Sequence, residues 1–256
     1  MVGRENNYRT FTSPARANKH NGGCLDLNDT FDLEKSGMSR QTTTQRYSPG
    51  EEIANSVTHG IGLVLSIAGL AVLVAFASLY GTLWHVVSCV VFGTTLILLY
   101  TASTLYHGLR APQAKSLMRV LDHSAIFLLI AGTYTPFTLV SMQGVWGWSL
   151  FGVVWGLAMI GILFQTTLLR RWLRASLFLY IAMGWAIVAA IKPLMAAVAP
   201  GGLVLLLLGG LAYTAGTLFY VRRSMRYHHA IWHGFVLAGS ALHFFAVLFY
   251  VIPLAA

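Results

Sequence analysis

Histidines at two places in the sequence have a spacing that suits metal binding. His229 and His233 are four positions apart, so on an α-helix their rings lie on one face about one turn apart. Two imidazoles placed in this way can bind one metal ion. Ser103 and His107 have the same spacing, and three histidines with an open water position form a typical catalytic zinc arrangement. His107, His229 and His233 are therefore the candidate zinc ligands.

A single carboxylate accompanies these candidates. Asp122 is the only acidic residue after Glu52, and it could hold or deprotonate a water on the metal. The segment from His229 to His233 is similar to the HExxH motif of zincins, but Ala230 stands where that motif has its glutamate base. Asp122 is thus the candidate base, with Ser103 in an assisting catalytic role. The alternative is a hydrogen-bonded polar network that only holds helices together.

Long apolar runs must position these residues, because they make up nearly all of the chain after residue 50. Only 10% of the residues are charged, whereas soluble domains carry about a quarter. A membrane-spanning helix needs about 20 mostly apolar residues, and each of the runs is long enough. The sequence therefore predicts an all-α integral membrane protein, a bundle of seven transmembrane helices. The expected helices cover 53–79, 84–106, 120–141, 145–168, 175–198, 202–221 and 230–254.

The chain divides into a polar tail and a membrane domain. Residues 1–50 are rich in Asn, Arg, Thr, Ser and Asp, so we expect a disordered tail, followed by the membrane domain over 51–256. The tail has no apolar core region of a signal peptide, and the first helix is expected to direct insertion. The two cysteines, Cys24 and Cys89, exclude a disulfide framework or a cysteine-based metal site.

Basic residues alternate between the two sides of the predicted bundle. All but one of the 17 Lys and Arg residues fall in the tail or in the second, fourth and sixth connections. The exception is Lys192, near the outer end of the fifth helix, where it can snorkel outward. Because cytoplasmic loops collect Lys and Arg, we expect a cytoplasmic N-terminus and a C-terminus outside, opposite to G-protein-coupled receptors. This topology explains the basic charge, so no nucleic-acid partner is expected.

On this topology, four segments bring polar groups to one depth near the cytoplasmic leaflet. Such residues are costly in lipid and normally face a bundle interior or a cavity, whereas scattered structural residues would not share a level. They are Glu52, Asn55 and His59 in the first helix, Ser103 and His107 in the second, Asp122 and His123 in the third, and His229 and His233 in the seventh.

The other histidines are expected to lie outside the metal site. His123 points about 100° away from Asp122 around a helix, so we expect a packing or loop-facing residue. His243 lies about 15 Å deeper than His233 and is expected to be a hydrogen-bonded core residue. His85 is expected at the outer interface.

Together these motifs resemble the bacterial hemolysin III branch of the PAQR family (progestin and adipoQ receptors). The motifs occur in the same order as in the family and extend through residues 51–250. The resemblance implies a seven-helix bundle with a zinc ion on the cytoplasmic side. It also implies that His107, His229 and His233 bind the zinc, that Asp122 contacts the zinc-bound water, and that Ser103 lines the site. The motifs are Glu52-x-x-Asn55-x-x-x-His59, Ser103-x-x-x-His107, residues 121–126, residues 131–137 and His229-x-x-x-His233.

Three functions are compatible with this resemblance. The wider superfamily is similar to alkaline ceramidases, which implies a zinc-dependent lipid amidase or esterase involved in membrane homeostasis. The second hypothesis is a membrane-lipid sensor in which zinc is structural. The third is a pore-forming cytolysin, which the near absence of polar residues in the outer half of the helices disfavours. Each of these three functions would place the protein in a bacterial inner membrane with lipids as partners. The sequence pattern does not define an oligomeric state.

Overall fold

The computed structural model describes residues 47–167 and 173–253, and those residues contain helices but no β-strand. Seven of the helices in this part of the chain are long and apolar enough to cross a membrane. The protein is therefore an all-α, multi-pass membrane protein, as the sequence predicts. Of the tail expected over residues 1–50, residues 1–46 lie outside the described residues, as do Arg170 and Arg171, whereas Pro49 and Gly50 already belong to the first helix.

The seven spans are built from ten helical elements, because two of the spans change helix type along their length. The third span passes from α-helix to π-helix directly after Pro136, and the fifth passes from α-helix through a short 3-10 turn to a second α-helix. The elements are α2 (Pro49–Tyr80), α3 (Leu83–Gly108), α4 (Pro112–Pro136), η1 (Phe137–Ser141), α5 (Gly144–Thr167), α6 (Leu173–Gly184), η3 (Ala186–Ala190), α7 (Ile191–Ala197), α8 (Pro200–Val221) and α9 (His228–Tyr250).

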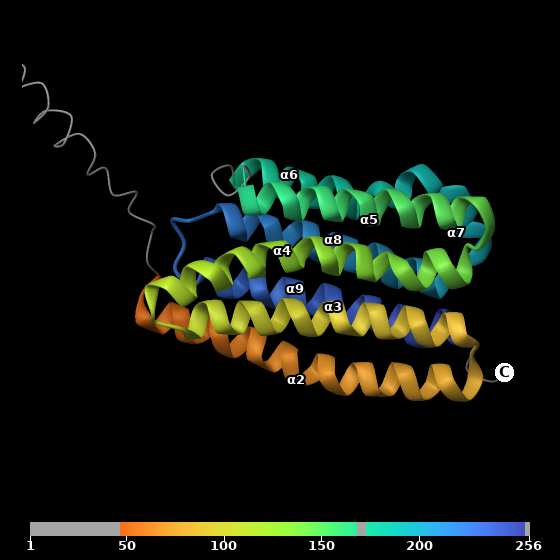
Figure 1. The fold of residues 1–256 in the computed structure, drawn as a ribbon, viewed down its shortest axis with the longest axis horizontal. Helices are drawn as coiled ribbons and strands as arrows, with labels where there is room; N and C mark the ends of the chain where they lie inside the picture. Colours follow the sequence, from red (N-terminus) through yellow and green to blue (C-terminus); the bar gives the residue numbers. More distant parts are fainter. Residues whose placement is uncertain (1–46, 168–172, 254–256) are drawn as a thin grey trace, which may run out of the picture. The chain divides into compact units, whose positions relative to one another are not determined.

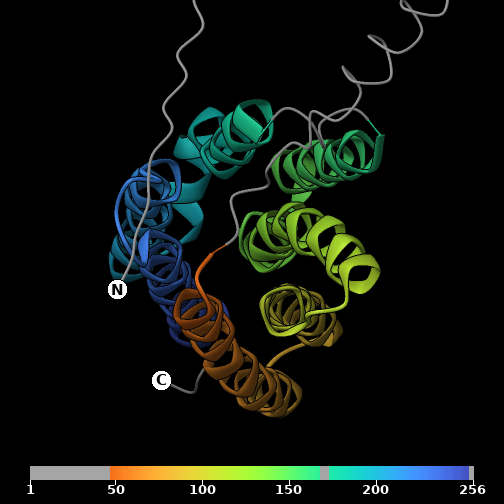
Figure 2. The same cartoon turned by 90° about the vertical axis from the view of Figure 1, so that its left-hand side faces the viewer.

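The helices run side by side and alternate in direction (Figure 1). Seen end-on, they form a ring in which α2 packs against both α3 and α9 (Figure 2). Around the rest of the ring, α3 packs against α4, α4 against α5, and α8 against α9, while α6 contacts α4, α5 and α8 more sparsely. This order brings the first residues of α2, α4 and α9 and the last residues of α3 to one end of the bundle, which we call the His-rich end.

The start of α2 is fixed by a capping box. Ser48 Oγ accepts a hydrogen bond from the Glu51 backbone N–H, the Glu51 carboxylate accepts one from the Ser48 N–H, and Pro49 occupies the first turn. The helix therefore begins ahead of the apolar run expected from residue 53. One face of its first turns is buried at Asn55 and His59, whereas Ile53 on the opposite face is 63% exposed, as expected for a side chain that faces lipid.

Two buried apolar clusters hold the helices of the bundle together. One cluster joins α2, α3 and α9 around Phe92, Tyr100 and Val247. The other joins α4 and α5 to the fifth span around Phe127 and Met183. Because each cluster fixes the rotation of its helices, it also fixes the direction in which the polar side chains on those helices point.

Candidate metal centre

Three buried histidines from two helices converge at the His-rich end. His107 is in the last turn of α3, and His229 and His233 occupy the first two turns of α9. Each offers one ring nitrogen, and these three nitrogens lie within 4.8 Å of one another. The i, i+4 pair on α9 thus meets the third histidine as the spacing predicts, and the three rings form a group that could hold a metal ion.

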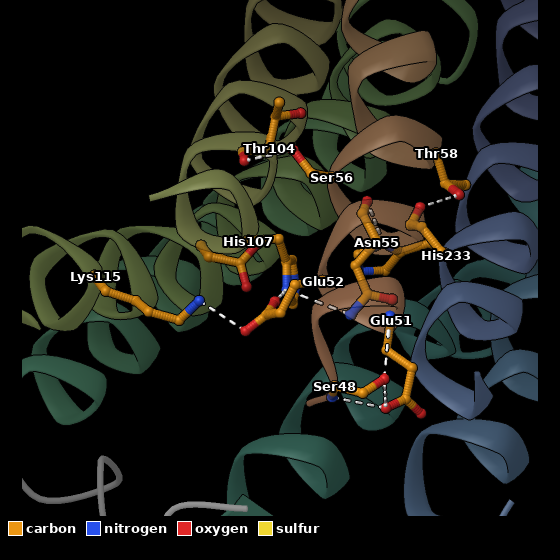
Figure 3. Close-up of polar contacts among 12 residues, drawn as sticks. Ser48, Glu51, Glu52, Asn55, Ser56, Thr58, Thr104, His107, Lys115 and His233 are labelled. Atoms are coloured by element: carbon orange, nitrogen blue, oxygen red, sulfur yellow. Dashed lines mark hydrogen bonds and ion pairs between the residues drawn. The ribbon is translucent and has the colours of Figure 1, made fainter. Parts of the chain in front are cut away.

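The ring of His107 is oriented by a carboxylate from α2. Glu52 Oε2 lies 2.6 Å from His107 Nδ1, and Lys115 Nζ donates to the other carboxylate oxygen at 2.7 Å (Figure 3). A carboxylate oxygen only accepts, so this contact assigns the proton of His107 to Nδ1. Nε2 of His107 is then the nitrogen with a free lone pair.

The ring of His233 is oriented by a backbone carbonyl. Its Nδ1 donates to the carbonyl oxygen of Asn55 at 3.1 Å, which leaves Nε2 with a lone pair. The ring of His59 stacks on the ring of His233, with centroids 3.4 Å apart and planes inclined by 14°. Helix α2 therefore fixes a ligand on α3 through Glu52 and a ligand on α9 through Asn55 and His59.

The chemistry of this donor set fits a zinc ion. Nε2 of His107 and Nδ1 of His229 are buried and have no hydrogen-bond partner within the described residues. Buried nitrogens without a partner are costly and call for an explanation such as an ion. Imidazole is a common zinc ligand, and partners that hold the second ring nitrogen, as Glu52 and Asn55 do, are typical around such ligands. Three histidines also leave a coordination position free.

A cavity of about 150 Å³ adjoins two of the three histidines, His229 and His233. Asp122 and Ser103 line it together with His229 and His233, so both catalytic candidates face the same space as two of the ligands. Asp122 is 8% exposed and Ser103 is fully buried, and the Ser103 hydroxyl has no hydrogen-bond partner among the described residues. Asp122 is not one of the three converging groups, so it is available to act on a molecule in the cavity.

Tyr47 covers the histidines at the end of the bundle. Its ring centroid lies 5.9 Å from that of His107, 5.1 Å from that of His229 and 5.8 Å from that of His228. Burial raises the pKa of the Tyr47 hydroxyl above its usual value, so the side chain remains neutral. An uncharged aromatic ring, two residues before the start of α2, therefore lies against the histidines at this end of the bundle.

Several of these partners do not follow from sequence spacing. Tyr47 has no motif that distinguishes it, and the pairing of Glu52 with His107 depends on how α2 and α3 are rotated. His123 lies beside the site rather than away from it, because it lines the cavity and its Nδ1 is 3.6 Å from Asp122 Oδ2. His243 is buried and donates from Nδ1 to the Gly239 carbonyl at 2.7 Å, as expected for a hydrogen-bonded core residue.

Comparison with known proteins identifies the class of this membrane protein. The family described as haemolysin-III related matches residues 47–244, and the chain belongs to that family. Hemolysin-3 homolog of Bacillus subtilis (strain 168) is 49% identical over 200 residues, which cover 78% of this chain and 94% of that protein. Hemolysin-3 of Bacillus cereus is 48% identical over 218 residues, 85% of this chain and 100% of that protein.

A more distant relative is found in animals. Monocyte to macrophage differentiation factor of Homo sapiens is 27% identical over 218 residues, 81% of this chain and 88% of that protein.

The family match begins at Tyr47, which is also the first described residue. The matched region therefore contains all three histidines, Glu52 and Asp122.

Proposed function

We propose that this protein is a zinc-dependent hydrolase that cleaves an amide or ester bond of a membrane lipid. The observation that carries the proposal is the convergence of three buried histidines within 4.8 Å, beside a cavity that Asp122 and Ser103 line. His107, His229 and His233 would hold the zinc. Bound there, a zinc ion would activate water as a nucleophile and polarise the carbonyl of the substrate.

The residues of the chain supply the proton transfers and the orientation. Hydrolysis adds one water across the C–N or C–O bond, and the proton released by the water has to reach the leaving amine or alcohol. Asp122 accepts that proton at a carboxylate oxygen and passes it to the leaving group, as a general base and then acid. The hydroxyl of Ser103, which lines the same cavity, donates a hydrogen bond to the substrate.

The apolar cavity supports a lipid as the substrate class. The cavity continues from the histidines between α4, α6, α8 and α9, and its walls include Ile126, Leu129, Leu177 and Val236. An acyl chain fits such walls, and lipid can enter from the side of a membrane protein. Membrane lipids are thus the expected partners of this site, as substrate or ligand.

The proposed location is a bacterial inner membrane, with the His-rich end facing the cytoplasm. The relatives from two Bacillus species support a bacterial membrane. The connections at the His-rich end and the adjoining first turns of α4 carry basic residues, whereas Lys192 in α7 is toward the opposite end. Basic residues of this kind face the cytoplasm. The basic residues are Arg110, Lys115, Arg119, Arg222, Arg223 and Arg226.

The proposal is tested by offering purified protein ceramides, other N-acyl lipids and phospholipids, with and without a zinc chelator. We expect hydrolysis of at least one lipid class, loss of that activity on chelation, and recovery on adding zinc. Turnover that persists after complete zinc removal would contradict the proposal. Absence of turnover with zinc bound would favour the alternative of a lipid sensor with structural zinc, and zinc-independent ion flux in liposomes would favour a pore.

A further inference from the structure

The cavity beside the metal centre has a second polar end farther along the bundle. His243 and Tyr213 line it there, together with Thr214 and Trp185. His243 follows His233 by ten residues on α9, a distance of about 15 Å along the helix. Between the two ends the cavity is lined by apolar side chains, which include Leu99, Ile126, Leu129 and Val236.

His243 presents an unpaired acceptor at this second end. Its Nδ1 donates to the carbonyl oxygen of Gly239 at 2.7 Å, which assigns the proton to Nδ1 and leaves a lone pair on Nε2. Within the described residues, Nε2 makes no hydrogen bond. The residue is only 8% exposed and its ring lines the cavity. His243 therefore brings a buried imidazole with a lone pair on Nε2 to the lining of this cavity.

Tyr213 adds a hydroxyl to the same end. Its ring stacks on His243 with centroids 5.4 Å apart, and its hydroxyl lies 2.9 Å from Ser240 Oγ. Ser240 Oγ also accepts a hydrogen bond from the Tyr100 hydroxyl at 2.9 Å. The position of the Tyr213 hydroxyl is thus fixed by a buried chain of hydroxyls that joins α3, α8 and α9.

Two glycines make room for this pair of rings. A Cβ atom on Gly209 would collide with Cε1 and Nδ1 of His243. A Cβ atom on Gly239 would lie 2.7 Å from the Tyr213 ring. Any larger residue at either position would displace the rings, so the backbone of α8 and α9 is shaped to seat His243 and Tyr213 against the cavity.

We propose that His243 and Tyr213 bind a hydroxyl group on the chain of an elongated, otherwise apolar acyl lipid whose carbonyl lies at the metal centre. This proposal rests on the proposed function for the position of the carbonyl. A hydroxyl matches the site because it donates to Nε2 of His243 and accepts from the Tyr213 hydroxyl. An unsubstituted chain offers no donor to Nε2 of His243 and leaves the Tyr213 hydroxyl with only its contact to Ser240, which is unfavourable.

The test compares matched probes that differ only in this hydroxyl. Saturated fatty acid amides, unsubstituted or hydroxylated at successive carbons, are bound to the purified, zinc-loaded full chain in nanodiscs, and affinity is measured without turnover. We expect the wild type to bind the best hydroxylated probe about tenfold more tightly than the unsubstituted one, the scale of one well-formed hydrogen bond. The preference should peak at carbons about 15 Å from the carbonyl.

Two variants test whether His243 and Tyr213 cause the preference for the hydroxylated probe. His243→Phe keeps an aromatic ring but removes the acceptor, so the preference should disappear while zinc content and affinity for the unsubstituted probe are retained. Tyr213→Phe should reduce the preference in part, and it provides the test if His243→Phe does not fold. Equal affinities in the wild type, a preference that does not depend on hydroxyl position, or a preference that both variants retain would overturn the proposal.

The same measurements separate this proposal from the proposed function. A position-dependent preference in the absence of any hydrolysis would support the hydroxyl site and contradict the hydrolase. Hydrolysis of hydroxylated and unsubstituted probes with equal affinity would support the hydrolase and contradict the hydroxyl site.

Discussion

Glu52 Oε2 lies 2.6 Å from Nδ1 of His107, and the second oxygen of the same carboxylate accepts a hydrogen bond from Lys115 Nζ at 2.7 Å. A residue in the first turn of α2 thus orients a candidate zinc ligand in the last turn of α3. Carboxylates in this position fix the tautomer of the imidazole and raise its basicity as a ligand. In the proposed metal centre, Glu52 is therefore a positioning residue.

Replacement of this carboxylate should weaken metal binding without abolishing it. We expect Glu52→Gln to lower zinc affinity by about 10–100-fold, the usual effect of losing a partner of a metal-bound histidine. The measurement is competition for zinc against a chromogenic chelator. Glu51→Gln is the matched control, because Glu51 bonds to Ser48 and to the Tyr227 backbone rather than to a histidine. Equal affinities of Glu52→Gln and wild type would show that the contact is not functional.

The sequence defines the spans well but their mutual rotation poorly. Length and apolarity alone predict seven crossings, and the i, i+4 spacing alone puts His229 and His233 on one face. Whether Glu52 reaches His107 depends on the rotation of α2 against α3, which is set by packing between segments that are far apart in the sequence. His123 illustrates the difficulty: its angular position on α4 predicts separation from Asp122, yet the cavity is wide enough to include both.

The break in the fifth span was equally inaccessible to periodicity, whereas Pro136 marks the irregularity of the third span in the sequence itself. The fifth span reads as one apolar run, but it is divided into α6, η3 and α7. Tyr47 also could not be found from spacing, because its contacts with His107 and His229 join residues far apart in the sequence.

Removal of the candidate base should separate metal binding from turnover. Asp122→Asn keeps the size of the side chain but cannot accept a proton at neutral pH. We expect near-normal zinc content, because Asp122 lies outside the three converging histidines, and a fall in lipid hydrolysis of about 100-fold or more. Ser103→Ala should have the smaller effect. Undiminished turnover in Asp122→Asn would remove Asp122 from the mechanism.

Tyr47 should control how quickly zinc leaves the site. Its ring covers His107 and His229, so Tyr47→Ala should speed zinc release to a chelator by about tenfold or more, because a path from the His-rich end is opened. Tyr47→Phe is the control, since it retains the ring and should release zinc at the wild-type rate. Stopped-flow measurement of release decides the question. Identical rates in all three proteins would mean that zinc leaves by another route.

The proposed orientation is open to a direct test with reporter fusions. Because basic connections face the cytoplasm, fusions after positions 50, 112, 172 and 225 should report a cytoplasmic location, and fusions after 82, 143, 200 and 256 an external one. Reversed readings at two internal connections would contradict the topology and would put the His-rich end on the other side of the membrane.

The metal content of the purified protein tests the central claim most directly. Zinc per chain is measured by mass spectrometry for wild type, His107→Ala, His229→Ala and His233→Ala, with His85→Ala as a control at the start of α3, away from the His-rich end. We expect about one zinc per chain in wild type and control, and loss of most of it in each of the three variants. Full zinc occupancy in both His229→Ala and His233→Ala would contradict the assignment of the metal centre.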